Sequence, residues 1–183
     1  MIIGITGTDG AGKGTVVDYL VSQKDFSHYS SRDFIVTEID AQGLERTRNQ
    51  MRLTANELRA THGDDVVIKK AYERATAEGK ENVVIESIRA AAEALYLKEK
   101  GGVLLSVDAD KHVRFGRVQA RRSETDKVDF DTFIAQEEIE KNDPEPHGMQ
   151  KAAVIEMSDF VIKNNGTLEE LHTQIEAFLN KVA

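Results

Sequence analysis

The sequence contains no cysteine, no tryptophan and only 2 prolines among its 183 residues. Because disulfides and cysteine-ligated zinc or iron–sulfur centres need sulfur ligands, all of these are excluded. No apolar run approaches the ~18 residues that a membrane-spanning helix needs. The first residues also lack the basic and long apolar segments of a signal peptide. We therefore expect a cytoplasmic protein that has no membrane partner.

Positive charge is also scarce, since 24 Lys and Arg residues stand against 32 Asp and Glu residues and give a net charge of −8. Proteins that bind nucleic acid contact its phosphates through a basic surface, so this balance argues against a nucleic-acid partner. The charges are unevenly placed, however. Residues 123–146 hold nine acidic residues against two lysines, whereas all 11 arginines lie between Arg32 and Arg122. The arginine-rich stretch is therefore where we expect anions to bind.

Short apolar runs alternate along the chain with stretches in which apolar residues recur at helical spacing. The clearest helix covers 168–182 and begins with a capping-box pattern from Thr167 to Glu170. The apolar runs are typical of strands buried in a parallel sheet, and they stand at residues 2–5, 83–85, 103–107 and 160–162. Residues 28–30 are expected to form another short strand. This alternation predicts one α/β domain over residues 1–183, with a central, mostly parallel sheet of about five strands.

A glycine-rich loop follows the first apolar run and precedes the first helical stretch. Residues 7–15 read Gly-Thr-Asp-Gly-Ala-Gly-Lys-Gly-Thr and match the pattern G-x-x-x-x-G-K in the strand–loop–helix context that the motif requires. Glycines let successive backbone N–H groups turn toward phosphate oxygens, the helix N-terminus adds a positive dipole end, and Lys13 adds a point charge. The loop therefore predicts a site for the phosphates of ATP, formed by Asp9, Gly10, Ala11, Gly12, Lys13, Gly14 and Thr15.

The loop resembles those of P-loop nucleoside monophosphate kinases. Gly-Lys-Gly-Thr at residues 12–15 is the form found in adenylate kinases, and Asp-Gly-Ala-Gly-Lys at residues 9–13 is similar to the loop of thymidylate kinases. The wider group includes the dephospho-coenzyme A kinases and an adenylate kinase-related family of archaea and bacteria. The resemblance implies a three-layer α/β/α P-loop fold, ATP and Mg²⁺ as cofactors, an acceptor-binding region at about residues 30–80 and a lid at about residues 114–147.

The loop departs from the usual motif at one position that bears on the metal. The hydroxyl residue expected directly after the lysine is replaced by Gly14, and the hydroxyl comes one place later, at Thr15. Thr15 is therefore the weaker candidate for a direct Mg²⁺ ligand, and Glu86, acting through water, is the stronger one.

Two arginines in the first half of the chain are candidates for binding an acceptor. Arg32 stands near the place where adenylate kinases begin their acceptor-binding region, although it precedes Asp33 instead of following it. A guanidinium can hold a phosphate through two parallel hydrogen bonds; a solvated arginine beside a capping serine is the alternative. Arg59 is the preferred candidate among the arginines of the next helical stretch.

Glu86 and Arg89 complete the predicted acceptor site. Glu86 ends the apolar run 83–85, and strand ends face the ligand in this class of fold, where an acid can hold Mg²⁺ through water or accept a proton. The resemblance places an acid and an acceptor-binding arginine at these two positions. A locally paired carboxylate is the alternative, and Asp108 is a competing acid that could instead cap the next helix together with Asp110.

Arg114, Arg117 and Arg121 fall on one face of a predicted helix, with Arg122 beside them. Like charges on one face repel, so local stability does not explain them, whereas a bound polyanion would. We expect Arg117 and Arg121 to be catalytic together with Lys13 and Arg89; a solvated basic helix face is the alternative. The acidic residues 123–146, with a helix at 131–142, are predicted to be a short lid.

The predicted function is transfer of the γ-phosphoryl group of ATP to a small molecule that carries a phosphate, such as a nucleoside or deoxynucleoside monophosphate. Asn164 and Asn165, by resemblance to dephospho-coenzyme A kinases, would lie near the adenine; a turn before the last helix is the alternative. Two other functions stay open: a dephospho-coenzyme A kinase-like enzyme, and a nucleotide-dependent switch without a small-molecule acceptor. The identity of the acceptor, and whether the chain is a monomer or a homodimer, are left open.

Overall fold

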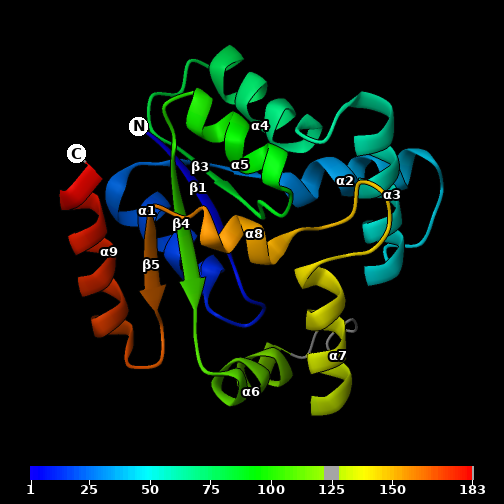
Figure 1. Cartoon of the computed structure of the whole chain (residues 1–183). Helices are drawn as coiled ribbons and strands as arrows, with labels where there is room; N and C mark the ends of the chain where they lie inside the picture. The colour runs from blue at the N-terminus through cyan, green and yellow to red at the C-terminus, as the bar shows by residue number, and fades with distance from the viewer. Residues whose placement is uncertain (122–127, 183) are drawn as a thin grey trace.

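The computed structural model describes residues 1–121 and 128–182. Nine helices and five strands follow one another within these residues (Figure 1). The strands are β1 (Ile2–Gly7), β2 (Ser27–Ser30), β3 (Val83–Glu86), β4 (Val103–Asp108) and β5 (Phe160–Lys163). The helices are α1 (Lys13–Lys24), α2 (Ser31–Ala41), α3 (Arg48–His62), α4 (Val66–Ala77), α5 (Ala91–Glu99), α6 (Lys111–Arg121), α7 (Phe130–Lys141), α8 (Lys151–Glu156) and α9 (Leu168–Val182). Arg122 and residues 123–127 of the acidic segment lie outside the described residues.

The five strands form one sheet in the order β2-β3-β1-β4-β5, and every pair is parallel. This confirms the predicted α/β fold with a central sheet of five strands. Parallel pairing brings the carboxyl ends of the strands to one edge: Ser30 of β2 pairs with Glu86 of β3, which in turn pairs with Ile5 of β1. The segments that follow these strands therefore begin side by side, and ligands bind at such an edge in open α/β sheets.

Alternating side chains of the strands pack against different helices on the two faces of the sheet. Val84 of β3 packs with α1 and α9, whereas its neighbours Val83 and Ile85 pack with α4, α5 and α8. Figure 1 shows α1 and α9 on one side of the sheet and α4 and α5 on the other. The capping box of α9 is present, since Glu170 accepts a hydrogen bond from Thr167 N and Thr167 Oγ1 accepts one from Glu170 N.

Three helices, α2, α5 and α8, were not predicted from the sequence. The apolar residues of α5 do not recur at helical spacing, so the sequence does not indicate this helix. Its start is fixed by a cap instead, because Glu93 accepts hydrogen bonds from the backbone N–H groups of Arg89 and Ala90. α8 has only 6 residues, which is too short to show a helical period. Within the described residues, no helix is long and apolar enough to cross a membrane.

Packing of α9 against the sheet should dominate its contribution to stability. Phe178 is completely buried in the core beside β5, whereas Leu168 of the same helix is 56% exposed. We expect Phe178→Ala to lower the free energy of unfolding by about 3–5 kcal/mol, because it leaves a cavity. Leu168→Ala is the control and should change it by less than about 0.5 kcal/mol. Urea unfolding followed by circular dichroism measures both, and equal losses would contradict this packing.

Candidate functional site

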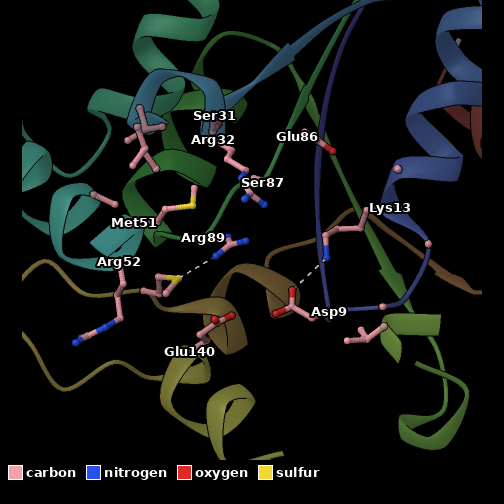
Figure 2. Close-up of a pocket in the computed structure, with 18 of the residues that line it drawn as sticks. Asp9, Lys13, Ser31, Arg32, Met51, Arg52, Glu86, Ser87, Arg89 and Glu140 are labelled. Atoms are coloured by element: carbon pink, nitrogen blue, oxygen red, sulfur yellow. Dashed lines mark hydrogen bonds and ion pairs between the residues drawn. The ribbon is translucent and has the colours of Figure 1, made fainter. Parts of the chain in front are cut away.

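A cavity of about 660 Å³ opens at the carboxyl edge of the sheet. Its walls come from the phosphate loop (residues 7–15), from α2 and α3 on one side, from α6 and α7 on the other, and from the residues that follow β3. Figure 2 shows side chains from these separate segments pointing into the same space. The cavity contains most of the site residues predicted from the sequence: Asp9, Gly10, Gly12, Lys13, Gly14, Thr15, Arg32, Arg59, Glu86, Arg89, Arg117 and Arg121.

Three glycines let the phosphate loop pack closely against its surroundings. Gly7, Gly10 and Gly12 have φ angles of 128°, 77° and 96°, which L side chains rarely adopt. A Cβ atom on Gly7 would collide with the carbonyl oxygen of Val107, and one on Gly12 would collide with the side-chain amide of Asn164. On Gly10 it would collide with a backbone oxygen of α6. The glycines are therefore required by the backbone path as well as by access for phosphates.

Polar contacts hold the same loop in place. Thr8 Oγ1 donates to Asp108 Oδ1 at 2.8 Å, and Lys163 Nζ donates to Asp108 Oδ2 at 2.6 Å. Burial alone would raise the pKa of the Asp108 carboxyl. These two hydrogen bonds outweigh that effect and hold the pKa below its usual range. Asp108 is thus engaged with the loop and does not line the cavity as a competing acid. The helix-capping role falls to Asp110 alone, whose Oδ1 accepts from His112 N at 2.9 Å.

Lys13 belongs to a partly buried group of charges at the cavity wall. Its Nζ donates to the backbone oxygens of Gly7 and Thr8 at 3.1 and 2.8 Å and lies 3.7 Å from Asp9 Oδ1. Burial lowers the pKa of Lys13 to about 8, and the Asp9 carboxylate partly opposes this shift. A lysine with this pKa still carries its charge through most of its population at neutral pH.

Lys151 and Glu140 belong to the same group and were not found from the sequence. Lys151 Nζ lies 3.3 Å from Asp9 Oδ1 and 2.8 Å from Glu140 Oε2, so it joins the phosphate loop to the end of α7. Lys151 is only 5% exposed and Glu140 only 4%. Nothing in the local sequence signals this contact, because Asp9, Glu140 and Lys151 come from separate segments that meet only in the folded chain.

Arg32 and Arg89 reach the cavity from the two adjacent strand ends. Figure 2 shows the Arg32 side chain extending from the start of α2 toward Ser87 and Arg89. Arg89 Nη1 lies 3.5 Å from the sulfur of Met149. Neither guanidinium has a carboxylate within salt-bridge distance among the described residues. These two predicted acceptor-binding arginines therefore line the cavity without a salt bridge in the described part of the chain.

Two other arginines at the cavity wall are already paired. Arg59, only 3% exposed, holds Glu93 at 3.0 Å, and its Nη1 lies 3.4 Å from the carbonyl oxygen of His147. Arg52 holds the buried carboxylate of Asp143 at 2.9 Å. The structure thus gives Arg59 a structural partner; its predicted contact with an acceptor stays a prediction.

The arginines of α6 differ from one another more than the sequence suggested. Arg114 is buried and forms a salt bridge with Glu137 of α7. The expectation that a bound polyanion accounts for these arginines was therefore wrong for Arg114, because a carboxylate of another helix pairs with it. Arg114 Nη1 also donates to the carbonyl oxygen of Asp9 at 3.1 Å. Arg117 Nη1 donates to Asn164 O at 2.9 Å and lines the cavity, as does Arg121.

Glu86 and Thr15 are the predicted magnesium ligands, and both line the cavity. Glu86 Oε1 lies 3.5 Å from His28 Nε2, and the hydrogen bond from His28 lowers the pKa of the Glu86 carboxyl while it raises that of His28. The described residues contain no cluster of three or more side chains that could hold a metal by themselves. The carboxylate of Glu86 and the hydroxyl of Thr15 are oxygen donors of the kind that Mg²⁺ takes.

Asn164 and Asn165 support the site from outside the cavity. Asn164 Nδ2 donates to Ala11 O at 2.8 Å and so braces the phosphate loop. Asn165 Oδ1 accepts from Asp110 N at 2.7 Å, at the start of α6. Neither residue lines the cavity. Their predicted place beside an adenine therefore stays a prediction, while their contacts to the loop and α6 are structural.

The chain is similar to known proteins in both sequence and structure. Residues 3–145 match the family model described as an AAA domain. A UPF0200 protein of Methanothermobacter thermautotrophicus is 30% identical over 100% of this chain and 91% of its own length, and one of Methanococcus maripaludis is 28% identical over 99% and 97%. The solved structure of shikimate kinase from Bacteroides thetaiotaomicron superposes with a TM-score of 0.65 at 14% identity, covering 100% of this chain and 98% of that one. This likeness shows the fold of P-loop small-molecule kinases.

The lowered pKa of Lys13 predicts how nucleotide binding depends on pH. Phosphates bind the protonated lysine, so the affinity for ATP should fall as the pH rises through about 8. Binding of a fluorescent ATP analogue between about pH 6.5 and about pH 9.5 measures this. Lys13→Met should bind the analogue more weakly, and its affinity should no longer fall as the pH passes about 8. Lys24→Met, on the same helix and away from the cavity, should keep this fall in affinity. An unchanged fall in affinity in Lys13→Met would contradict the assignment.

The Arg114–Glu137 salt bridge predicts that two neighbouring glutamates of α7 contribute differently to the free energy of unfolding. Glu137→Ala leaves the buried Arg114 guanidinium without its carboxylate and should destabilise the protein by about 3–5 kcal/mol. The side chain of Glu138 is 60% exposed, so Glu138→Ala should cost at most about 1 kcal/mol. Urea unfolding compares the two variants. If Glu137→Ala were as stable as Glu138→Ala, the salt bridge between α6 and α7 would contribute nothing to stability.

Proposed function

The chain belongs to the AAA domain family and to the UPF0200 family, and from this premise we propose that it transfers the γ-phosphoryl group of ATP to a small molecule that carries a phosphate. One observation carries the proposal. A single cavity has a phosphate loop with Lys13 on one wall and, on another, the guanidinium groups of Arg32 and Arg89, which form no salt bridge with a described carboxylate. Two separate sets of anion-binding groups around one space suit two anionic substrates, of which one gives and the other receives a phosphoryl group.

The donor side is formed by the phosphate loop. The start of α1 and the backbone N–H groups of residues 10–15 would surround the phosphates of ATP. Lys13 Nζ, now bonded to two backbone oxygens of the loop, would exchange them for β- and γ-phosphate oxygens. Phosphate oxygens carry more charge than carbonyl oxygens, so this exchange favours the bound nucleotide.

The acceptor side is formed by α2, α3 and the residues after β3. Arg32 and Arg89 would hold the acceptor phosphate, and the apolar side chains of Ile35, Met51 and Val67 line the remaining wall. Apolar side chains can pack against the flat faces of a nucleobase, so an apolar wall beside a phosphate site suits a nucleoside or deoxynucleoside monophosphate. This acceptor class is therefore the one that we favour.

The transfer itself needs position and charge rather than a covalent intermediate. An oxygen of the acceptor phosphate attacks the γ-phosphorus, the bond from that phosphorus to the β–γ bridging oxygen breaks, and ADP leaves with the electron pair. A phosphate oxygen is already ionised at neutral pH, so no proton has to be removed. Arg117 and Arg121 line the cavity beside the loop, where they would neutralise charge on the transferring group. Glu86, through water, is the residue that would hold Mg²⁺, with Thr15 as the weaker candidate, and the ion would supply further positive charge.

Two other functions compete with this one. A dephospho-coenzyme A kinase-like enzyme would use the same donor side but needs room for a larger acceptor. A nucleotide-dependent switch would need no acceptor site, and the arginines on the second wall speak against it. The fold is also shared with shikimate kinases, and this likeness alone does not identify an acceptor.

A coupled assay of ADP release tests the proposal. The full chain with ATP and Mg²⁺ is presented with each nucleoside and deoxynucleoside monophosphate, with dephospho-coenzyme A and with shikimate. We expect at least one monophosphate to raise turnover well above the rate with ATP alone. Turnover that no acceptor raises would reject the proposal, and turnover with dephospho-coenzyme A or shikimate alone would reject the monophosphate acceptor.

Lys13→Ala tests the role of the loop in the same assay. We expect the variant to lose at least about a hundredfold in turnover, since it removes a charge from the transferring phosphoryl group. Its circular dichroism spectrum should match that of the unchanged protein, because no buried carboxylate depends on Lys13 alone: Asp9 keeps Lys151. Lys24→Ala is the matched control on α1. If Lys13→Ala kept normal turnover, the loop would have no part in the reaction.

A further inference from the structure

Asp9 places a carboxylate at the wall of the cavity that should receive phosphates. It is the third residue of the phosphate loop, and its side chain is 15% exposed and lines the cavity together with Lys13. Figure 2 shows this carboxylate turned toward Lys13, whose Nζ lies 3.7 Å from Asp9 Oδ1. Like charges repel, and more strongly at a partly buried site than in water. An acid at this position therefore opposes the binding of a nucleotide unless another cation offsets its charge.

Lys151, at the start of α8, supplies such a cation. Its Nζ donates to Asp9 Oδ1 at 3.3 Å, the same oxygen that lies 3.7 Å from Lys13 Nζ. Lys151 is 5% exposed and is not among the residues of the cavity wall, so it does not reach a ligand in the cavity. The two lysines thus share one carboxylate oxygen, and of the two it is Lys13 that faces the cavity.

Glu140, near the end of α7, is a second partner of Lys151. Its Oε2 accepts a hydrogen bond from Lys151 Nζ at 2.8 Å, which is shorter than the contact between Lys151 and Asp9. Glu140 is 4% exposed, so its charge is buried together with that of Lys151. A buried cation that lies between two carboxylates divides its attraction between them. Glu140 therefore limits how far Lys151 neutralises Asp9.

Lys13 has to leave its present contacts when a nucleotide binds. Its Nζ donates to the backbone oxygens of Gly7 and Thr8, which are neutral and so compete weakly with phosphate oxygens. A carboxylate competes more strongly, because it carries a full charge. The more of the Asp9 charge Lys151 offsets, the more readily Lys13 exchanges its contacts for phosphate oxygens.

From these contacts we infer that Lys151 is a positioning residue for nucleotide binding, which offsets the charge of Asp9 and so leaves the Lys13 ammonium to the phosphates. Lys151 acts through Asp9 and touches no substrate. Glu140 adjusts the strength of this effect, because it draws on the same ammonium group. The inference rests on the proposed function only in taking a nucleoside triphosphate as the ligand of the phosphate loop.

Binding of a fluorescent ATP analogue to the full chain, at neutral pH and without an acceptor, tests this role. We expect Lys151→Met to weaken binding about tenfold, because Asp9 then competes with the phosphates for Lys13 and repels them. Lys98→Met is the matched control: Lys98 of α5 holds Asp159 at 2.6 Å and is not among the residues of the cavity wall, so this variant should bind the analogue normally. Normal binding by Lys151→Met would overturn the inference.

A second substitution separates this effect of charge from a purely structural one. Asp9→Asn removes the charge that Lys151 offsets, so the double variant Asp9→Asn/Lys151→Met should regain most of the affinity that Lys151→Met loses. If Lys151 only held α8 against the loop, the double variant would bind no more tightly than Lys151→Met, and the inference would be wrong.

Glu140→Gln should act in the opposite direction from Lys151→Met. We expect it to bind the analogue at least as tightly as the unchanged protein, because the Lys151 ammonium is then no longer divided between Glu140 and Asp9. Weaker binding by Glu140→Gln would show that the tie to α7, rather than the charge on Asp9, governs the loop, and would contradict the inference.

The same background keeps the test valid if Lys151→Met does not fold, since that variant leaves the buried Glu140 carboxylate without this lysine. Lys151→Met/Glu140→Gln removes both charges of the pair, and its melting temperature shows that it is folded. It should bind the analogue about tenfold more weakly than Glu140→Gln alone, because Asp9 again lacks Lys151. Equal binding by these two variants would reject the role of Lys151.

The outcome is separable from that of the proposed function. If the variants bind the analogue as expected while no acceptor raises ADP release, the role of Lys151 stands and the phosphotransferase proposal fails. If an acceptor raises turnover while Lys151→Met binds the analogue normally, the proposed function stands and the role of Lys151 fails. If the unchanged chain does not bind the analogue, both fail.

Discussion

The site depends on how closely the phosphate loop packs against its surroundings. Gly7, Gly10 and Gly12 each approach a neighbour at a distance that leaves no room for a side chain. The neighbours belong to different parts of the chain: β4, α6 and the turn after β5. Asn164 and Thr8 fasten the same loop by hydrogen bonds. Because one loop is held by several elements, its backbone N–H groups keep their direction without a ligand, and preorganised donors of this kind are what phosphoryl transfer requires.

The second constraint is how the arginines are partnered. The fold brings many guanidinium groups to one cavity, and a cavity with that much positive charge would be costly if all remained unpaired. Glu93, Asp143 and Glu137 neutralise Arg59, Arg52 and Arg114 respectively. Arg32 and Arg89 are left to face the cavity without a carboxylate partner among the described residues. Glu137 and Asp143 of the acidic segment thus pair with two of the arginines and leave Arg32 and Arg89 without a salt bridge among the described residues.

The sequence was sufficient to predict those parts of the structure that depend on residues close together in the chain. The strands appear as apolar runs, the phosphate loop has a fixed spacing, and Glu86 and Arg89 could be placed because a parallel sheet collects strand ends at one edge. The remaining features depend on contacts between distant segments. The Arg114–Glu137 salt bridge joins residues on separate helices, and Lys151 meets Asp9 only after folding.

The central claim is that the γ-phosphoryl group passes to a second molecule rather than to water. It is tested most directly with ATP whose γ-phosphoryl group carries heavy oxygen, incubated with the protein, Mg²⁺ and a mixture of nucleoside monophosphates, and followed by mass spectrometry of the products. The account predicts the label in the terminal phosphate of a nucleoside diphosphate. Label found in inorganic phosphate alone would contradict it and would identify the chain as a nucleotide hydrolase or switch.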